Sequence, residues 1–164
     1  LRPPPSPGHP ELAEAHRSAV DAQIDHFWKG ASGYDIGDQE EQSILGTTDA
    51  QRDPEARPAT FGEVTRLGCR QIGEALGLDG NGAAERAVFM DLGSGLGTLA
   101  VQAYLEWPSV VRAEGVEMST SRALLASAAW ASLAASGEAA ALRVASHALE
   151  GIACDKAEDV ESFV

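Results

Sequence analysis

Apolar residues recur at helical spacing in two stretches of the N-terminal half of the chain. The first stretch, 11–29, is followed by Gly30, so we predict a helix that ends there. The second stretch, 60–76, begins with a capping-box pattern in which Thr60 caps the helix and Glu63 reaches back to it. Two helices are therefore expected before the glycine-rich part of the sequence.

The segments that flank the first helix lack this periodicity. Residues 1–10 contain five of the eight prolines, which predicts a disordered tail. Residues 31–59 are rich in Gly, Asp, Glu, Gln and Thr and contain few apolar positions. We predict a long polar loop there, and a loop of this length is either functional or disordered.

A short apolar run at 87–90 begins a different pattern, because a continuous run of this length suits a buried parallel strand. Glycines follow it, then a predicted helix at 98–107 that Pro108 ends, and a predicted second strand at 110–116. This order predicts an α/β fold with a Rossmann-like parallel sheet.

Beyond the second strand, Ser119 or Thr120 can cap a helix that continues to Gly137. Residues 142–145 are expected to form a third strand, and 163–164 the start of a fourth. The sheet is thus predicted to be truncated after three or four strands, with a helical N-terminal extension. We expect the chain to be part of a longer protein.

The glycine turn indicates the kind of cofactor. Its sequence at 91–97, DLGSGLG, places glycines where the backbone must turn sharply and a ligand must approach it, at the N-terminus of a helix. The spacing is GxGxG, and Thr98 stands where the dinucleotide fingerprint has its third glycine. Asp91 would repel a pyrophosphate but attract a cationic sulfonium or ammonium group. These features favour S-adenosylmethionine over NAD, and the absence of a following Gly-Lys-Ser/Thr excludes a P-loop.

Glu117 follows the second strand directly. A carboxylate at that strand end is placed to accept both hydroxyl groups of a ribose. A solvated surface glutamate is the alternative interpretation, and the glycine turn beside it makes ribose binding the stronger one.

Composition narrows the classes of function. The net charge of -13 argues against non-specific nucleic-acid binding and is compatible with a small molecule or a basic protein partner. No apolar run is long enough to span a membrane. Cys69 and Cys154 are too few for a disulfide framework and lack zinc-ligand spacing with the histidines, so we expect an intracellular protein with reduced thiols and no metal site.

Two motifs resemble those of one family, the non-SET histone lysine methyltransferases of the disruptor-of-telomeric-silencing type, within the class I S-adenosylmethionine-dependent methyltransferases. The strand and turn at 88–97 together with Gly115-Val116-Glu117 are similar to the family's FVDLGSGxG and GVE motifs. The segment 59–64, ATFGEV, is similar to its VYGET segment, which folds over the methionine end of the cofactor. The resemblance covers about residues 55–150.

The sequence pattern and the resemblance together predict a domain order, and the resemblance implies a set of cofactor-binding residues. Residues 1–10 would be a tail, 11–59 a helix and loop, and 60–164 the N-terminal part of a methyltransferase domain. This domain would methylate lysine. The protein would be in the nucleus if the substrate is a histone and otherwise in the cytoplasm. The cofactor-binding residues would be Glu63, Val64, Asp91, Gly93, Ser94, Gly95, Gly97, Thr98 and Glu117. No catalytic residue is assigned.

The sequence also departs from the family pattern. Val64 and Thr98 stand where the family has Thr and often Gln, and His147-Ala148 is the nearest match to its adenine-binding Asp-Phe pair. The family's basic nucleosome-contacting segment has no counterpart in this acidic chain. Two other functions stay open: a class I methyltransferase for another protein or a small molecule, and a degenerate, non-catalytic interaction module.

Overall fold

The fold is described from a computed structural model over residues 10–45, 61–78 and 86–149. These residues form helices and two strands in the order α1 (Pro10–Phe27), α2 (Asp38–Leu45), α3 (Arg66–Ala75), β1 (Ala87–Leu92), α4 (Thr98–Glu106), β2 (Val110–Val116), α5 (Thr120–Ser136) and α6 (Glu138–Leu149). The prolines at 1–9 lie outside the described residues, and Pro10 already belongs to α1.

The sheet confirms the predicted strand–helix–strand unit. β1 pairs in parallel with β2, in a register that joins Leu92 to Val116 and Asp91 to Gly115, and α4 makes the crossover between them. Because the strands are parallel, their carboxyl ends meet at one edge, where the glycine turn and Glu117 also lie. In the described part of the chain this sheet has two strands.

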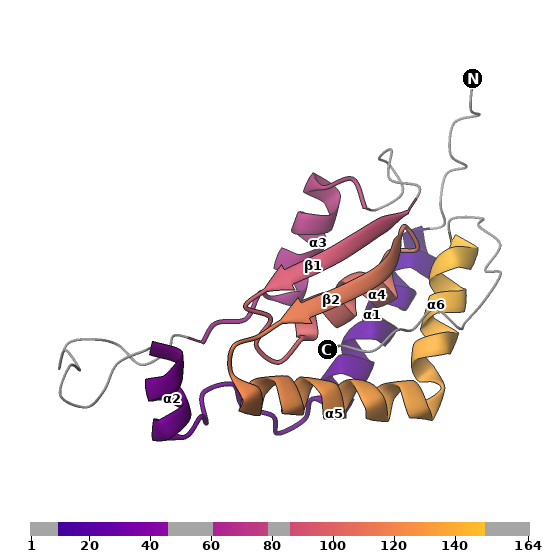
Figure 1. The fold of residues 1–164 in the computed structure, drawn as a ribbon. Helices are drawn as coiled ribbons and strands as arrows, with labels where there is room; N and C mark the ends of the chain where they lie inside the picture. The colour runs from indigo at the N-terminus through magenta and orange to yellow at the C-terminus, as the bar shows by residue number, and fades with distance from the viewer. Residues whose placement is uncertain (1–9, 46–60, 79–85, 150–164) are drawn as a thin grey trace.

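Helices cover one face of the sheet (Figure 1). α4 packs against both strands, and α1 packs on α4 from the side away from the sheet, with α3 and α6 also against α4. Val20 and Ile24 of α1 and Val101 and Leu105 of α4 are fully buried in this core. The burial of their apolar surface is the main term that holds α1 on the α/β unit.

The prediction of a buried strand needs correction, because the face of β1 away from the helices is exposed. Val88, Met90 and Leu92 are 59%, 54% and 75% exposed, while the alternate residues Phe89 and Asp91 point to the helices and are half-buried. Successive side chains of a strand point to opposite faces, and the described helices cover only one of them. A continuous apolar run cannot by itself report how many faces are covered.

The predicted third strand is wrong. Residues 142–145 lie inside α6, which begins one residue after Gly137, a left-handed glycine (φ 82°) that ends α5. Leu142, Arg143 and Ser146 are buried on one side of this helix, which is helical periodicity, and the alanines around them favour a helix. The predicted fourth strand at 163–164 lies outside the described residues.

Two predictions about the N-terminal half also need correction. The expected loop contains a helix at 38–45, whereas residues 46–60 lie outside the described part. The capping box does not start α3, because 61–65 are not helical and the cap is Thr65, whose hydroxyl accepts a hydrogen bond from Gly68 N. The cap of α3 thus lies five residues later than predicted, whereas the predicted C-terminal end of the helix at Gly77 (φ 68°) is confirmed.

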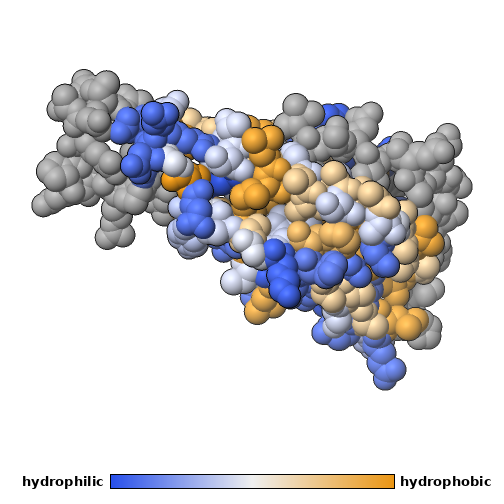
Figure 2. All heavy atoms as spheres, turned by 90° about the horizontal axis from the view of Figure 1, so that it is seen from below, coloured by the Kyte–Doolittle hydropathy of each residue, from blue (hydrophilic) through white to orange (hydrophobic). Residues whose placement is uncertain are grey.

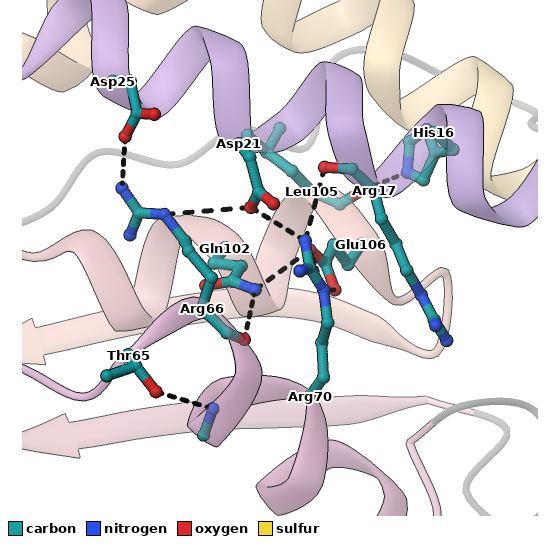
Figure 3. A network of polar contacts seen from close by, with 11 residues as sticks. His16, Arg17, Asp21, Asp25, Thr65, Arg66, Arg70, Gln102, Leu105 and Glu106 are labelled. Carbon is teal, nitrogen blue, oxygen red and sulfur yellow. Dashed lines mark hydrogen bonds and ion pairs between the residues drawn. The ribbon is translucent and has the colours of Figure 1, made fainter.

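A network of polar side chains joins α1, α3 and α4 (Figure 3). Arg70 donates from Nη2 to Glu106 at 2.6 Å and to Asp21 at 2.8 Å, and Gln102 donates to Glu106 at 3.0 Å. The Glu106 side chain is only 3% exposed, so these bonds replace its lost hydration. The network thereby fixes how α1 and α3 sit on α4.

Cys69 lies in this core without a disulfide, and burial raises the pKa of its thiol to about 12. Cys69 is thus a free, buried thiol, while Cys154 lies outside the described residues. The thiolate is the reactive form of cysteine, so Cys69 is chemically inert at neutral pH.

The underside of the molecule, seen in Figure 2, is hydrophilic toward α2 and more apolar toward α5. Leu124 and Leu125 of α5 are 65% and 41% exposed. None of the described helices combines the length and the apolar character that crossing a membrane requires.

Candidate functional site

The glycine turn between β1 and α4 adopts the conformation that its sequence predicts. Gly93, Gly95 and Gly97 have φ angles of 86°, 56° and 77°, in the left-handed region that glycine enters without steric cost. Gly93 N and Ser94 N donate to Val116 O at 2.7 and 3.1 Å, which ties the turn to the end of β2. The turn is thus held by the backbone of both strands.

Gly97 is the N-cap of α4 and supplies no side-chain cap. The first backbone N–H groups of a helix have no partner within the helix, so this end of α4 can receive a negatively charged or hydrogen-bonding part of a ligand. Thr98, the first residue of α4, places a hydroxyl at the same point and is 8% exposed.

Glu117 lies beside this turn, at the end of β2. Its Oε2 accepts a hydrogen bond from Gly95 N at 2.7 Å, and its Oε1 accepts one from Ser119 N at 2.8 Å. The predicted proximity of Glu117 to the turn is therefore present in the structure. A carboxylate has about four lone-pair positions, so both oxygens can still accept hydroxyl groups from a ligand.

Asp91 faces the same region from β1. Burial and the nearby negative charge of Glu117 raise the pKa of its carboxyl group. Among the described residues, none donates a hydrogen bond to this carboxylate. A half-buried acid beside a second acid costs folding free energy, and such arrangements concentrate at functional sites.

The Phe61 ring covers the turn. A Cβ atom on Gly95 would lie 2.6 Å from its Cε2, and a Cβ on Gly33 would lie 2.2 Å from its Cζ. Tyr34 meets the ring edge-on at a centroid distance of 5.0 Å. The ring therefore fits between two glycines, one before α2 and one in the turn.

A cavity of about 710 Å³ opens on the α1 side of Phe61. Trp28 closes one side of it and donates from Nε1 to Leu96 O at 2.7 Å. Its lining consists of Ile24, Asp25, Trp28, Ala31, Tyr34, Phe61, Glu63, Val64, Thr65, Arg66, Leu96 and Thr98. This volume lies within the roughly 300–1,000 Å³ of small-molecule sites.

The structure divides the predicted site residues into two groups. Glu63, Val64 and Thr98 line the cavity. The other residues, Asp91, Gly93, Ser94, Gly95, Gly97 and Glu117, form the turn and its acidic partners and are not among the lining residues. Phe61, which is not a predicted site residue, connects the two groups, because its ring contacts Gly95 and also lines the cavity.

Comparison with known proteins assigns this arrangement to a family. The family model for histone methylation protein DOT1 matches residues 57–143, more than half of the 164 residues. The chain belongs to the DOT1 family. Searches of curated proteins and of solved structures each gave no match.

The DOT1 match runs from the segment before α3 into α6 and includes every predicted cofactor-binding residue. It confirms the resemblance seen in the two motifs and implies a methyltransferase fold, of which the parallel β1–α4–β2 unit is a part. α1 and α2 precede the match. The proposed division of the chain at residues 10 and 59 stays a prediction.

Several residues around the glycine turn and the cavity are not among the predicted site residues. Phe61 stood inside the similar ATFGEV segment but was not counted as a site residue. Trp28 follows the last residue of α1 and lines the cavity. Gly33 and Arg122 had no sequence signal, since their roles depend on a contact that joins distant segments.

The structure has His147-Ala148, the nearest match to the family's adenine-binding Asp-Phe pair, in a helix. Both residues lie in the last turn of α6 rather than at the end of a strand, and His147 Nδ1 lies 2.8 Å from Arg143 O of the same helix. A helix at this place does not present a loop at the carboxyl edge of the sheet. Within the described ranges, no group of three His, Cys, Asp or Glu side chains is arranged to hold a metal ion.

Replacing Asp91 with asparagine is expected to stabilise the DOT1-family fold at neutral pH by up to about 1 kcal/mol, since solvent screens a half-buried charge. The raised pKa means that the folded state binds the proton more tightly than the unfolded chain. The cost of the carboxylate therefore appears as the pH rises above its ordinary pKa of 3.8 and is absent below it.

Chemical denaturation from pH 3 to pH 7 measures this effect. Asp35→Asn serves as the control, because Asp35 is exposed, and this variant should show no comparable gain in stability. If Asp91→Asn instead loses stability relative to wild type as the pH rises, the ionised Asp91 carboxylate does not cost folding free energy as described.

Proposed function

We propose that this DOT1-family chain binds S-adenosylmethionine at the glycine turn and takes part in methylating a lysine of a basic protein such as a histone. The observation that carries the proposal is the hydrogen bond between Glu117 and Gly95 N, which places a carboxylate against a glycine turn at the carboxyl ends of two parallel strands. Ligands of open α/β sheets bind at that edge.

The residues present fit this cofactor. Glu117 has acceptor capacity for ribose hydroxyls, and the N-terminus of α4 with Thr98 can receive a carboxylate. Asp91 and Glu63 supply negative charge for the sulfonium and ammonium groups. The cavity beside the turn has room for a ligand of this size.

The cofactor supplies an electrophilic methyl group on its sulfonium sulfur, and the protein supplies alignment and exclusion of water. In this chain, Phe61 and Trp28 provide apolar walls of the cavity, and Glu63 and Val64 also line it. An attacking lysine must be neutral, which an apolar channel favours by lowering its pKa. No residue of the chain is assigned as a general base.

The DOT1 family and the negative net charge of the chain both support a basic protein as the partner. DOT1 proteins are histone methylation proteins, and a chain with a net charge of -13 suits a basic substrate protein. Location in the nucleus is part of the same proposal.

Isothermal titration of the chain with S-adenosylhomocysteine tests the proposal. We expect binding by wild type and at least about tenfold weaker binding by Glu117→Ala, since loss of paired polar contacts in a site costs on the order of 1–3 kcal/mol. Glu114→Ala, on β2 but outside the turn, is the control and should bind as wild type does. Equal binding by wild type and Glu117→Ala would refute the site.

A second candidate is a non-catalytic interaction module. The helix at 138–149, where the sequence predicts a third strand, favours it. This candidate predicts that neither S-adenosylmethionine nor its product binds, so the same titration separates the two functions.

A further inference from the structure

Arg122 connects three parts of the site that are far apart in the sequence. It lies in the first turn of α5 and is 6% exposed. Its Nε donates to Gly33 O at 2.7 Å, its Cζ lies 4.8 Å from the centroid of the Phe61 ring, and its Nη1 lies 3.9 Å from Oε1 of Glu117. The guanidinium thus contacts the segment before α2, the cover over the turn and the acid at the end of β2.

The three contacts together use a property that arginine has and lysine lacks. The planar guanidinium can lie over an aromatic ring and at the same time donate in its own plane from several nitrogens. Burial strengthens these interactions, because solvent screens them little. Gly33 O and Phe61 are held together in this way, and the Phe61 ring in turn rests on Gly95.

The charge of Arg122 also balances the two acids of the site. The negative charge of Glu117 helps to raise the pKa of Asp91, so the two carboxylates repel one another when both are ionised. Arg122 is a buried cation close to Glu117. Its attraction favours the position in which Glu117 accepts the bond from Gly95 N.

A separate contact fixes the helix turn that carries Arg122. Glu40 of α2 accepts hydrogen bonds from Ser119 Oγ at 2.7 Å and from Ser121 N at 2.9 Å, at the N-terminus of α5. The bonds from the Ser121 hydroxyl and backbone, together with the one from Ser119, lower the pKa of Glu40. α2 and the segment before it are therefore tied to α5 at two points, Glu40 and Gly33.

From this geometry we propose that Arg122 is a positioning residue for the cofactor site: it sets the Glu117 carboxylate against Gly95 and holds the Phe61 ring over the turn. The proposal rests on the proposed function, since the site it organises is the one assigned to S-adenosylmethionine. Arg122 itself is not assigned a contact with the ligand.

The test compares Arg122→Met with Arg143→Met in the 164-residue chain. Arg143 is a matched control because it is equally buried, at 6% exposed, and its guanidinium bonds to Trp107 O and Val110 O, away from the turn. Two quantities are measured: the affinity for S-adenosylhomocysteine and the hydrogen-exchange rate of the Gly95 N–H in the free protein. The second needs no ligand.

We expect Arg122→Met to weaken binding by about 10–100-fold, as small displacements of positioning groups do, and to speed exchange at Gly95 by about tenfold relative to the core amides. Arg143→Met should lower global stability. It should change the affinity and the Gly95 exchange rate only as far as that loss of stability accounts for. Arg122→Lys, which keeps the charge near Glu117, should fall between wild type and Arg122→Met.

A double-mutant cycle gives the sharpest readout. Adding Glu117→Ala to Arg122→Met should cost less than about threefold more affinity if Arg122 acts through Glu117, whereas Glu117→Ala and Arg143→Met should be additive. The role of Arg122 would be overturned if wild type binds, Arg122→Met and Arg143→Met lose equal affinity, and the exchange rate of the Gly95 N–H does not change. That result would leave the proposed function standing. Absence of wild-type binding would overturn both.

Discussion

Replacing Arg70 with methionine is expected to destabilise the fold by about 3 kcal/mol, because it leaves a buried carboxylate without its cation. Glu106 receives Arg70 Nε on both oxygens, at 3.0 and 3.1 Å, and Nη2 at 2.6 Å, and its side chain is 3% exposed. After the substitution only the hydrogen bond from Gln102 remains among these contacts. α3 and α1 would then lose their common anchor on α4.

Urea denaturation measures this change. The double variant Arg70→Met/Glu106→Met should recover more than half of the loss, since a buried ion pair replaced by apolar side chains costs little. Arg66→Met is the control: Arg66 pairs at 3.3 Å with Asp25, whose side chain is 76% exposed, and at 3.8 Å with Asp21, whose side chain is 30% exposed. Pairs this long and this exposed contribute little, so we expect a loss below about 1 kcal/mol. A loss for Arg70→Met no larger than for Arg66→Met would show that the network is not buried as described.

Replacing Gly95 with alanine is expected to reduce the affinity for S-adenosylhomocysteine by about 100-fold, the scale on which small misplacements in a site act. The new Cβ would sit 2.6 Å from Phe61 Cε2, at a backbone φ of 56° that alanine adopts only with strain. The turn or the ring must move, and the hydrogen bond from Gly95 N to Glu117 moves with it.

Gly93→Ala separates the two causes. Gly93 has a φ of 86°, but a methyl group added there would meet no heavy atom within 4 Å, so the variant carries the backbone strain without the contact with Phe61. Titration calorimetry should show a clearly smaller loss for Gly93→Ala than for Gly95→Ala. If both variants bind as wild type does, the turn does not hold the ligand.

The strand–turn–helix–strand unit could be predicted from the sequence because its signals are local. Glycines at 93, 95 and 97 match the left-handed φ angles of the turn, and Ser119 and Gly137 cap α5 at the predicted ends. The position of Glu117 also follows locally, since parallel neighbours place their carboxyl ends at one edge.

The rest depends on tertiary contacts that no short window contains. Residues 142–145 fit both strand and helix patterns, and packing of α6 on α1, α4 and α5 selects the helix. Polar residues at 38–45 form α2, whose Glu40 bonds to Ser119 and Ser121, which lie 79 and 81 positions later in the chain. Thr65 rather than Thr60 caps α3, although both are acceptable caps by residue type.

The site shows the same division. The turn and Glu117 were predicted, whereas Phe61, Gly33 and Arg122 come together only in the folded chain. The DOT1 family explains why Phe61 lies in a recognisable segment. It does not explain Arg122, whose role is inferred from three contacts.

The central claim is that the glycine turn with Glu117 holds the cofactor, and amide NMR of the ¹⁵N-labelled chain tests it most directly. On titration with S-adenosylhomocysteine, we predict saturable shifts of the Gly93, Gly95 and Gly97 amides, which are lost in Glu117→Ala and kept in Glu114→Ala. Saturable binding that leaves these three amides unshifted, or no binding at millimolar ligand, would contradict the account.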